Sequence, residues 1–406
     1  MHHSPSRRTP VAHPPGLVLF ALAIGAFAIG TTEFATMSLL PYFAVDLKID
    51  APTAGHVISA YALGVVVGAP VLTVLAARMA RRTLLLWLMA MFSLFNGLCA
   101  FAPSYHWLLV LRFLSGLPHG AYFGIGALVA VSLVPLNKRS QAVGRMFLGL
   151  TAATIIGVPF ANWLGHTVSW RWGFGLVAVT GVLTVIMVGW TVPRSPAEPG
   201  SSPLRELGAL RQPQVWLTLA TGAIGFGGLF AVYTYLADTL MHVTGVSAGI
   251  IPLVLGVFGV GMTVGNIVVP WFADRALMPT AGGLLVWSAL ATAFFPLAAG
   301  NAWTVSVDVF LIGVGGALGT ILQTRLMDVA RDAQGLAAAL NHSAFNFANA
   351  LGPFLGGIAI AHGLGWASTG LVGSGLALGG LVLLLVSVWF GRARIAGSPA
   401  APVYKA

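Results

Sequence analysis

Long apolar runs separated by short polar segments repeat along the whole chain. A run of about 20 apolar residues is long enough to cross the hydrocarbon core of a bilayer as a helix. The pattern therefore predicts an all-α integral membrane protein. The twelve transmembrane helices that it predicts cover residues 16–40, 54–76, 84–102, 107–134, 143–164, 171–192, 215–239, 248–272, 281–299, 303–323, 336–361 and 368–390.

Composition supports this fold class and excludes others. Hydrophobic residues make up 57% of the 406 residues and charged residues only 7%, whereas about 25% of residues are charged in ordinary soluble domains. A water-soluble enzyme is therefore excluded, and we expect no catalytic residues. The 51 glycines and 23 prolines suit closely packed, locally kinked membrane helices. Cys99 is the single cysteine, which excludes an internal disulfide framework.

The basic residues predict the orientation of the chain. An even number of spans puts both termini on one side, and cytoplasmic loops are enriched in Lys and Arg. With cytoplasmic termini, 17 of the 20 basic residues fall in cytoplasmic segments, and only Lys48, Arg112 and Arg171 do not. The seventeen are Arg7, Arg8, Arg78, Arg81, Arg82, Lys138, Arg139, Arg145, Arg194, Arg205, Arg211, Arg275, Arg325, Arg331, Arg392, Arg394 and Lys405. We therefore expect a protein of the cytoplasmic (inner) membrane with both termini in the cytoplasm.

The segments outside the spans predict little further structure. Residues 1–15 are expected to form a disordered cytoplasmic tail without a cleavable signal peptide, and residues 391–406 a second cytoplasmic tail. A net charge of +10 would suggest nucleic-acid binding in a soluble protein, but here the basic residues lie in short loops. The expected partners are therefore the lipid bilayer and a small-molecule substrate, with no nucleic acid, and the chain is expected to act as a monomer.

A polar linker, residues 193–213, divides the chain into two halves, 16–192 and 214–390, and its proline- and serine-rich composition predicts a flexible tether. The halves repeat at a shift of about 195 residues. The matching positions are Arg78 and Arg275, Trp107 and Trp303, Arg112 and Asp308, and Gly157-Val-Pro159 and Gly352-Pro353. The sequence thus predicts two pseudo-symmetric six-helix bundles, the architecture in which many secondary transporters rock two halves about a site near the membrane midplane.

Four stretches resemble one family of transporters. They are Gly30-Thr-Thr-Glu-Phe34, Arg78-Met-Ala-Arg-Arg82, the segment 112–124 from Arg112 to Gly124, and Gly157-Val-Pro159. Over residues 16–390 the chain resembles the major facilitator superfamily (MFS), and within it the twelve-helix drug:proton antiporters of the sugar (arabinose-type) efflux and chloramphenicol-export branch. The resemblance implies a secondary transporter that exports a drug or sugar by alternating access, with the proton as coupling ion and no other cofactor.

The resemblance also implies gating residues. These are Arg78, Arg81, Arg82, Asp274, Arg275, Gly157, Pro159, Gly352 and Pro353. The chain departs from the family pattern in several places, among them the second copy of the loop motif, where Pro270 replaces the leading glycine. Ala77 stands where the loop between the second and third helices usually has an aspartate, and Asn162-Trp163 stand where the fifth helix usually has a glycine pair.

Three charged residues are expected at one depth in the membrane, namely Glu33, Arg112 and Asp308. An intramembrane charge costs several kcal/mol unless it is paired or hydrated. Glu33 is therefore either the protonation switch of an antiporter, with Arg112 as the partner that adjusts its charge, or one member of a fixed Glu33–Arg112 ion pair. For Asp308 we expect an auxiliary or structural role.

Two histidines lie within the predicted spans. His119 is expected near the middle of the membrane, roughly 18 Å along its helix. It either relays protons, since histidine titrates near neutral pH, or makes a neutral hydrogen bond between helices. His342 is expected at the membrane interface. The spacing of the histidines indicates no metal site.

The resemblance implies that the first, fourth, seventh and tenth helices line a substrate cavity, flanked by the second, fifth, eighth and eleventh. The lining residues that this predicts are Glu33, Met37, Tyr61, His119, Tyr122, Phe123, Asn162, Phe226, Phe230, Tyr233, Asn341, Phe345, Asn346 and Asn349. Aromatic rings with a few amides suit a partly apolar solute. The alternative for each residue is helix packing, because amides also join membrane helices.

Two other functions remain open from the sequence. A facilitator or uniporter of sugars or nucleosides would need only a structural Glu33–Arg112 pair. A solute sensor without transport would need an output domain, and neither short terminus offers one. The glycines Gly313, Gly315 and Gly316 follow no strand and belong to no phosphate-binding motif, so ATP is not expected to drive transport.

Overall fold

The computed structural model describes residues 13–196, 200, 202–247 and 249–396, and all regular structure in these residues is helical. Twelve helical stretches are long and apolar enough to cross a membrane. The predicted fold class, an all-α membrane protein with twelve spans, is thereby confirmed. The predicted tail before residue 16 lies almost wholly outside the described residues, as does the second tail beyond Ala396, where α17 ends.

The first half contains seven α-helices and the second half nine. In the first half these are α1 (Pro15–Asp46), α2 (Ala51–Leu75), α3 (Arg81–Cys99), α4 (Tyr105–Ser132), α5 (Arg139–Ala152), α6 (Val158–Thr167) and α7 (Trp170–Thr191). In the second they are α9 (Pro213–Gly225), α10 (Gly227–Thr234), α11 (Leu236–Thr239), α12 (Ile251–Ala273), α13 (Leu277–Ala298), α14 (Ala302–Val314), α15 (Leu318–Val329), α16 (Gln334–Ala359) and α17 (Thr369–Ala396). Several spans are therefore built from two helices in line.

The fifth span is interrupted where it passes the first. A π-helical turn, Ala153–Gly157, joins α5 to α6 directly before Pro159, whose missing N–H weakens the regular helical ladder. A Cβ on Gly157 would lie 2.2 Å from Thr31 Oγ1 of α1, so only glycine permits this approach. The second half has the equivalent contact, since a Cβ on Gly352 would lie 2.2 Å from the carbonyl oxygen of Gly227. The repeat seen in the sequence therefore corresponds to two equivalent helix crossings.

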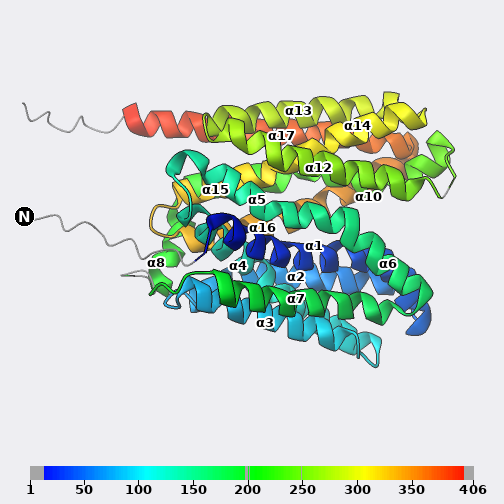
Figure 1. The fold of residues 1–406 in the computed structure, drawn as a ribbon. Coiled ribbons are helices and arrows are strands. Elements are labelled where there is room, and N and C mark those ends of the chain that lie inside the picture. Colours follow the sequence, from blue (N-terminus) through cyan, green and yellow to red (C-terminus); the bar gives the residue numbers. More distant parts are fainter. Residues whose placement is uncertain (1–12, 197–199, 201, 248, 397–406) are drawn as a thin grey trace, which may run out of the picture.

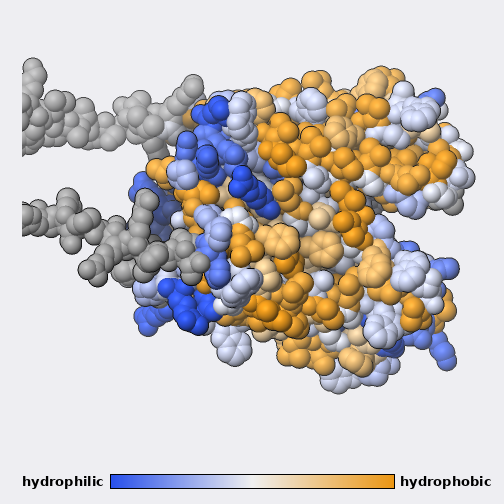
Figure 2. Space-filling model, in the orientation of Figure 1, coloured by the Kyte–Doolittle hydropathy of each residue, from blue (hydrophilic) through white to orange (hydrophobic). Residues whose placement is uncertain are grey.

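The two halves form separate bundles that contact each other through a few helices. Figure 1 shows α1–α7 in blue to green on one side, and the yellow to red helices α13, α14 and α17 on the far side of the other bundle. The contact between the halves is made by α5 with α12, and by α16 with α2 and α4. Figure 2 shows apolar side chains over the middle of the visible face, as expected for a surface in contact with lipid.

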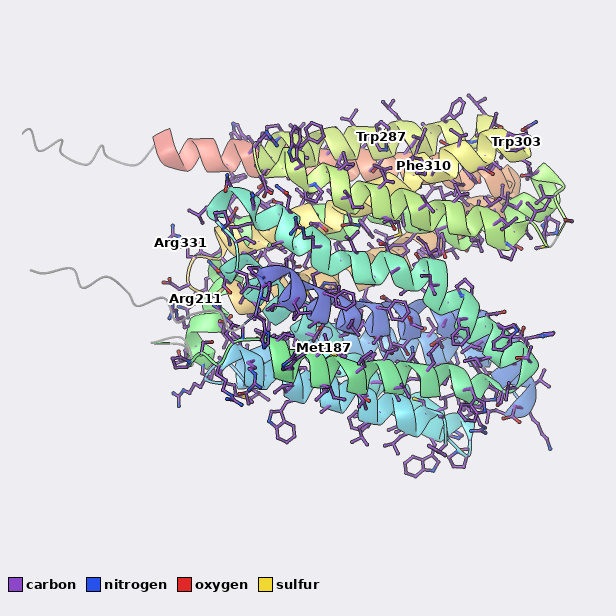
Figure 3. All side chains as sticks on the ribbon, viewed as in Figure 1. Met187, Arg211, Trp287, Trp303, Phe310 and Arg331 are labelled. Carbon is purple, nitrogen blue, oxygen red and sulfur yellow. The ribbon has the colours of Figure 1, made fainter. Side chains whose placement is uncertain are left out.

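Charged residues gather where α1 begins and α17 ends. Arg211 and Arg331 lie at this end, and Trp303 lies at the other (Figure 3). We call the end where α1 begins the basic end, because it carries Arg78, Arg81, Arg82, Lys138, Arg139, Arg205, Arg211, Arg275 and Arg331. The other end is called the opposite end. The space-filling view shows the two bundles parted by a notch toward the opposite end (Figure 2).

The linker contains regular structure that contacts both halves. It contains a short helix, α8 (Pro203–Leu207), which contacts α2 of the first half and α16 of the second. Arg205 Nη2 lies 3.4 Å from Asp332 Oδ1, and Glu206 Oε2 accepts a hydrogen bond from the backbone N–H of Leu336 at 2.7 Å. The expectation of a purely flexible connection is therefore corrected, because α8 bridges both halves at the basic end.

Candidate functional site

A cavity of about 50 Å³ lies between the two halves. The first half contributes Glu33, Phe34, Phe147, Leu150 and Thr154 to its wall, and the second half contributes Phe226, Leu229, Phe230, Tyr233, Phe258, Met262, Asn266, Gly316, Gly319 and Phe345. A cavity shared by both halves would change shape whenever they move relative to each other.

Glu33 supplies the one ionisable carboxylate in this wall. It lies on α1 and is half-buried. Among the described residues no basic nitrogen lies within 4.0 Å of its carboxylate oxygens, so the fixed Glu33–Arg112 ion pair is absent from this conformation. A carboxylate that is not held by a basic side chain remains available to a proton or a solute.

A hydrogen bond and an aromatic ring stabilise the buried charge of Arg112 in place of an ion pair with Glu33. Its side chain on α4 is 1% exposed, and Nη1 donates a hydrogen bond to Thr32 Oγ1 at 2.9 Å. The guanidinium carbon lies 4.2 Å from the centroid of the Tyr61 ring, within the range of a cation–π interaction. Thr32 Oγ1 in turn donates to Asn96 Oδ1 at 2.7 Å, so this network joins α1, α3 and α4 directly beside Glu33.

Tyr61 also begins a polar chain that crosses between the halves. Its hydroxyl lies 3.0 Å from Nδ1 of His119, and Nε2 of His119 lies 3.2 Å from Nδ1 of His342 on α16. His119 and His342 are 1% and 3% exposed. The expectation of an interfacial His342 is therefore corrected, because a helix of the other half covers it.

Asp308 lies apart from this network. Its side chain on α14 is 1% exposed, and within the described part of the chain neither carboxylate oxygen has a hydrogen-bond partner. It does not line the cavity. The structure therefore brings Arg112 close to the residues around Glu33 but leaves Asp308 isolated within the second half.

Five of the predicted lining residues lie in the cavity wall, namely Glu33, Phe226, Phe230, Tyr233 and Phe345. Several others donate hydrogen bonds to backbone carbonyl groups and do not line the cavity. The Tyr122 hydroxyl donates to Leu22 O at 2.9 Å, the Asn162 amide to Ser38 O at 3.1 Å, the Asn341 amide to Gly319 O at 3.2 Å and the Asn346 amide to His342 O at 2.9 Å. Phe123 stacks on His342 at a ring distance of 4.1 Å, Met37 is 37% exposed, and Asn349 is half-buried.

The sequence did not single out most of the remaining wall. Phe147, Thr154, Phe258 and Asn266 come from the fifth and eighth spans, where those spans cross between the halves. An amide within an apolar run, such as Asn266, is the one signal of this kind that the sequence offers.

The predicted gating residues take different parts in closing the basic end. Asp274 Oδ1 accepts a hydrogen bond from the backbone N–H of Ser140 at 2.7 Å, and Oδ2 accepts from Gln141 Nε2 at 2.9 Å and from its backbone N–H at 3.2 Å. Asp274 thus caps the start of α5 from the other half, where the helix dipole favours an anion. Arg139 and Asp328 add an ion pair of 2.6 Å across the same contact.

Two of the basic gating residues donate hydrogen bonds within their own half. Arg82 Nη2 donates to the carbonyl oxygen of Gly189, and Arg275 Nη1 donates to Trp271 O at 2.8 Å. Arg78 is exposed in the turn after α2. Arg81 lines a space of about 170 Å³ beside α8. Pro159 lies in the first turn of α6, and Pro353 O accepts a hydrogen bond from the Tyr235 hydroxyl at 2.9 Å.

Hydrogen bonds between the two halves are confined to one part of the molecule. In the described ranges they run from Thr263–Thr151 at 3.0 Å, at the level of the cavity, through His119–His342 to Asp274 at the basic end. The basic end is therefore closed in this conformation.

Known proteins are similar to this chain in sequence over most of its length. The sequence model of the Major Facilitator Superfamily matches residues 22–330. The chain is 42% identical over 369 residues to the "Inner membrane transport protein YdhP" of Escherichia coli (strain K12), covering 91% of this chain and 94% of that protein. It is 33% identical over 374 residues to a "Chloramphenicol resistance protein" of Streptomyces lividans, covering 88% and 93%.

A solved structure has the same fold. The crystal structure of the human organic anion transporter MFSD10 (TETRAN) superposes with a TM-score of 0.70 at 13% sequence identity, covering 93% of this chain and 100% of that one. At this identity the similarity extends to the fold alone. The relatives are transporters, in agreement with the expectation that the chain is not an enzyme.

Proposed function

The chain belongs to the Major Facilitator Superfamily, and we propose that it is a proton-coupled exporter of small molecules that works by alternating access. The observation that carries the proposal is the Glu33 carboxylate, which lines a cavity between the halves without an ion-pair partner among the described residues. A transporter that only equilibrates its solute has no need of such a group.

Exchange of a proton for the solute at Glu33 would couple their movements. The cavity of about 50 Å³ has one ionisable carboxylate, so a proton and a solute that donates to this carboxylate would compete for it. Arg112 stays bonded to Thr32 and stacked on Tyr61, and so it does not occupy the Glu33 carboxylate. Loss of the proton would then accompany binding of the solute.

The direction of transport depends on which side the cavity faces. If the basic end faces the cytoplasm, as the distribution of Lys and Arg predicts, the present conformation is closed toward the cytoplasm. Proton uptake from outside would precede reopening of the basic end. One proton moving across about 100 mV with one unit of pH difference releases roughly 3.7 kcal/mol, which supports roughly 500-fold accumulation of a neutral solute.

The wall of the cavity favours an amphipathic drug over a sugar. Seven of its fifteen residues are aromatic, and only Glu33, Thr154, Asn266 and the Tyr233 hydroxyl offer polar side-chain groups. A sugar would leave most of its hydroxyl groups without partners, and an unpaired polar group costs free energy. We therefore place the substrate among aromatic or apolar solutes with a cationic or hydrogen-bond-donating group, and the chloramphenicol resistance relative supports this choice.

Transport into proteoliposomes tests the proposal. Inside-out vesicles with an acidic interior would receive labelled chloramphenicol or arabinose from outside, and Glu33→Gln would be compared with the wild-type protein. We expect uphill transport of chloramphenicol in the wild type, with a loss of at least 10-fold in the variant while downhill exchange persists. Asp238→Asn, a half-buried acid toward the opposite end, is the matched control and should transport normally.

Two outcomes would contradict the proposal. Uphill transport that survives in Glu33→Gln would make this carboxylate structural. Downhill movement of the same solute that never becomes uphill under a gradient would identify a facilitator.

A further inference from the structure

We propose that His119 and His342 form a proton-sensitive latch between the two halves, which holds the basic end closed until the pair takes up a second proton. The inference rests on the proposed function only for the direction of the cycle. The latch itself follows from the geometry of the two imidazoles.

The pair lies at the tightest contact between α4 and α16. His119 Nε2 and His342 Nδ1 are 3.2 Å apart, and both side chains are almost fully buried. The backbones approach closely beside them, since a Cβ on Gly124 would lie 2.7 Å from the backbone nitrogen of Ala339. The imidazoles therefore have no room to turn apart while the halves remain in contact.

The number of bound protons decides whether this contact is favourable. In the neutral pair one of the two facing nitrogens carries a hydrogen and donates to the other. One added proton keeps the hydrogen bond and gives it charge assistance, which strengthens it. A second added proton places N–H groups on both facing nitrogens and two positive charges on adjacent rings. The hydrogen bond is then lost, and the charges repel in a site of low dielectric.

The surroundings offer little compensation for a doubly charged pair. From α2, Tyr61 contacts His119 through its hydroxyl, with Arg112 behind the Tyr61 ring. The aromatic rings of Phe147 on α5 and Phe345 on α16 contact His342, and Phe123 on α4 stacks on it. Among the described residues no carboxylate contacts either imidazole, and His342 Nε2 has no hydrogen-bond partner.

The pair lies one layer of side chains away from the cavity. Phe147 and Phe345 line the cavity and also contact His342, with ring distances of 5.7 Å for each. The two rings thus separate the latch from the wall that carries Glu33. A proton that enters an outward-open cavity would meet Glu33 first and the latch next. Opening the basic end after proton uptake is the order that an exporter exchanging protons for solute requires.

Distance measurement between spin labels tests the latch without substrate or gradient. Labels on Asn137→Cys and Arg331→Cys, exposed on either half at the basic end, would be introduced in a Cys99→Ala background of the full chain in lipid nanodiscs. We expect one short distance at pH 8 and a growing longer-distance population as the pH falls to 5. The open-to-closed ratio should rise by up to about 10-fold per pH unit for one coupled proton.

Two variants and one control isolate the histidines. His342→Gln and His119→Gln keep a polar group but cannot gain a proton, so each should abolish the pH dependence between pH 8 and 5. His362→Gln changes an exposed histidine in the π-helical turn Ile360–Leu364 that follows α16 in the same span, and it should behave as the wild type. Acids also help to close the basic end, namely Asp274, Asp328, Asp332 and Glu206, and the histidine variants separate any response of these acids from that of the latch.

A wild-type distance that does not change above pH 5 would overturn the inference, even if neither variant could be purified. A pH response retained in His342→Gln would overturn it as well, by assigning the response to the carboxylates. Failure of proton-driven transport with an intact pH response would instead contradict the proposed function and leave the latch standing.

Discussion

Asp274 of the second half caps α5 of the first, with its Oδ1 2.7 Å from the backbone nitrogen of Ser140. Asp274 belongs to the second copy of a repeated loop. Ala77 stands at the matching position of the first copy. An acidic cap of this kind is therefore present in one copy of the repeated loop and absent from the other.

Removing this cap should loosen the basic end. Asp274→Asn keeps the volume but loses the charge that favours hydrogen bonds to the first turn of α5, a loss of about 1–2 kcal/mol. Labelling of a cysteine at the buried position Thr324, which lines the same contact, should become roughly 5–30-fold faster. Asp332→Asn should change the rate far less, because its carboxylate is 80% exposed and exposed ion pairs contribute little. Equal rates in the wild type and Asp274→Asn would show that the cap does not hold the end closed.

Glycine at the crossing of α1 and the fifth span should be essential for stability. Gly157→Ala would place its methyl group 2.2 Å from Thr31 Oγ1, and we expect a loss of about 1–3 kcal/mol and a lower Tm. Gly283→Ala in α13 is the matched control, because no atom lies within 4 Å of its Cβ position. Adding Thr31→Ala should restore part of the lost stability. If Gly157→Ala unfolds like the wild type, the close approach does not require glycine.

A polar cluster ties three helices at the opposite end. Arg171 Nη1 donates to the carbonyl oxygens of Ala100 and Ala102 at 3.1 and 2.9 Å, and Nη2 lies 3.2 Å from Asp46 Oδ2. Arg171→Lys keeps the charge but cannot reach all three acceptors, so it should lower the free energy of unfolding by about 1 kcal/mol. Asp46→Asn should cost less, since that ion pair is partly exposed. Thermal unfolding in detergent would measure the loss of stability in both variants. A larger loss in Asp46→Asn than in Arg171→Lys would contradict the greater importance of the carbonyl contacts.

Asp50 provides a local pH dependence outside the membrane spans. A hydrogen bond from the Thr53 side chain, followed by one from its backbone N–H, lowers the pKa of this carboxyl group below its usual value of 3.8. Because the pKa is lowered in the folded state, the contribution to stability is present above pH 4 and is lost as the pH falls through the folded-state pKa. NMR titration of a chain labelled at aspartate should find the pKa of Asp50 below 3.8 in the wild type. In Thr53→Ala the pKa of Asp50 should lie closer to 3.8. An unchanged value in Thr53→Ala would exclude this hydrogen bond as the cause.

The spans and the symmetry could be predicted from sequence because they depend on local composition. Apolar length fixes a transmembrane helix, and the glycines at positions 157 and 352 mark the same crossing in both halves. Glu33 could be identified for a similar reason, since a lone acid in an apolar run must find a partner or a cavity.

Contacts between the halves could not be predicted in this way. His342 lies only eight residues after α16 begins, so distance along the helix alone suggests an interfacial side chain. Its burial comes from α4, more than 200 residues earlier in the chain, and no periodicity within α16 records that neighbour. The wall residues of the fifth and eighth spans escaped notice for the same reason.

Proton release on substrate binding tests the central claim most directly. Chloramphenicol would be added to the purified protein in weakly buffered detergent solution near pH 7, and the released protons counted with a pH indicator. Competition at Glu33 predicts up to one proton released per bound solute in the wild type and none in Glu33→Gln. Release of the same number of protons by Glu33→Gln would contradict the account, because another group would then exchange the proton for the substrate.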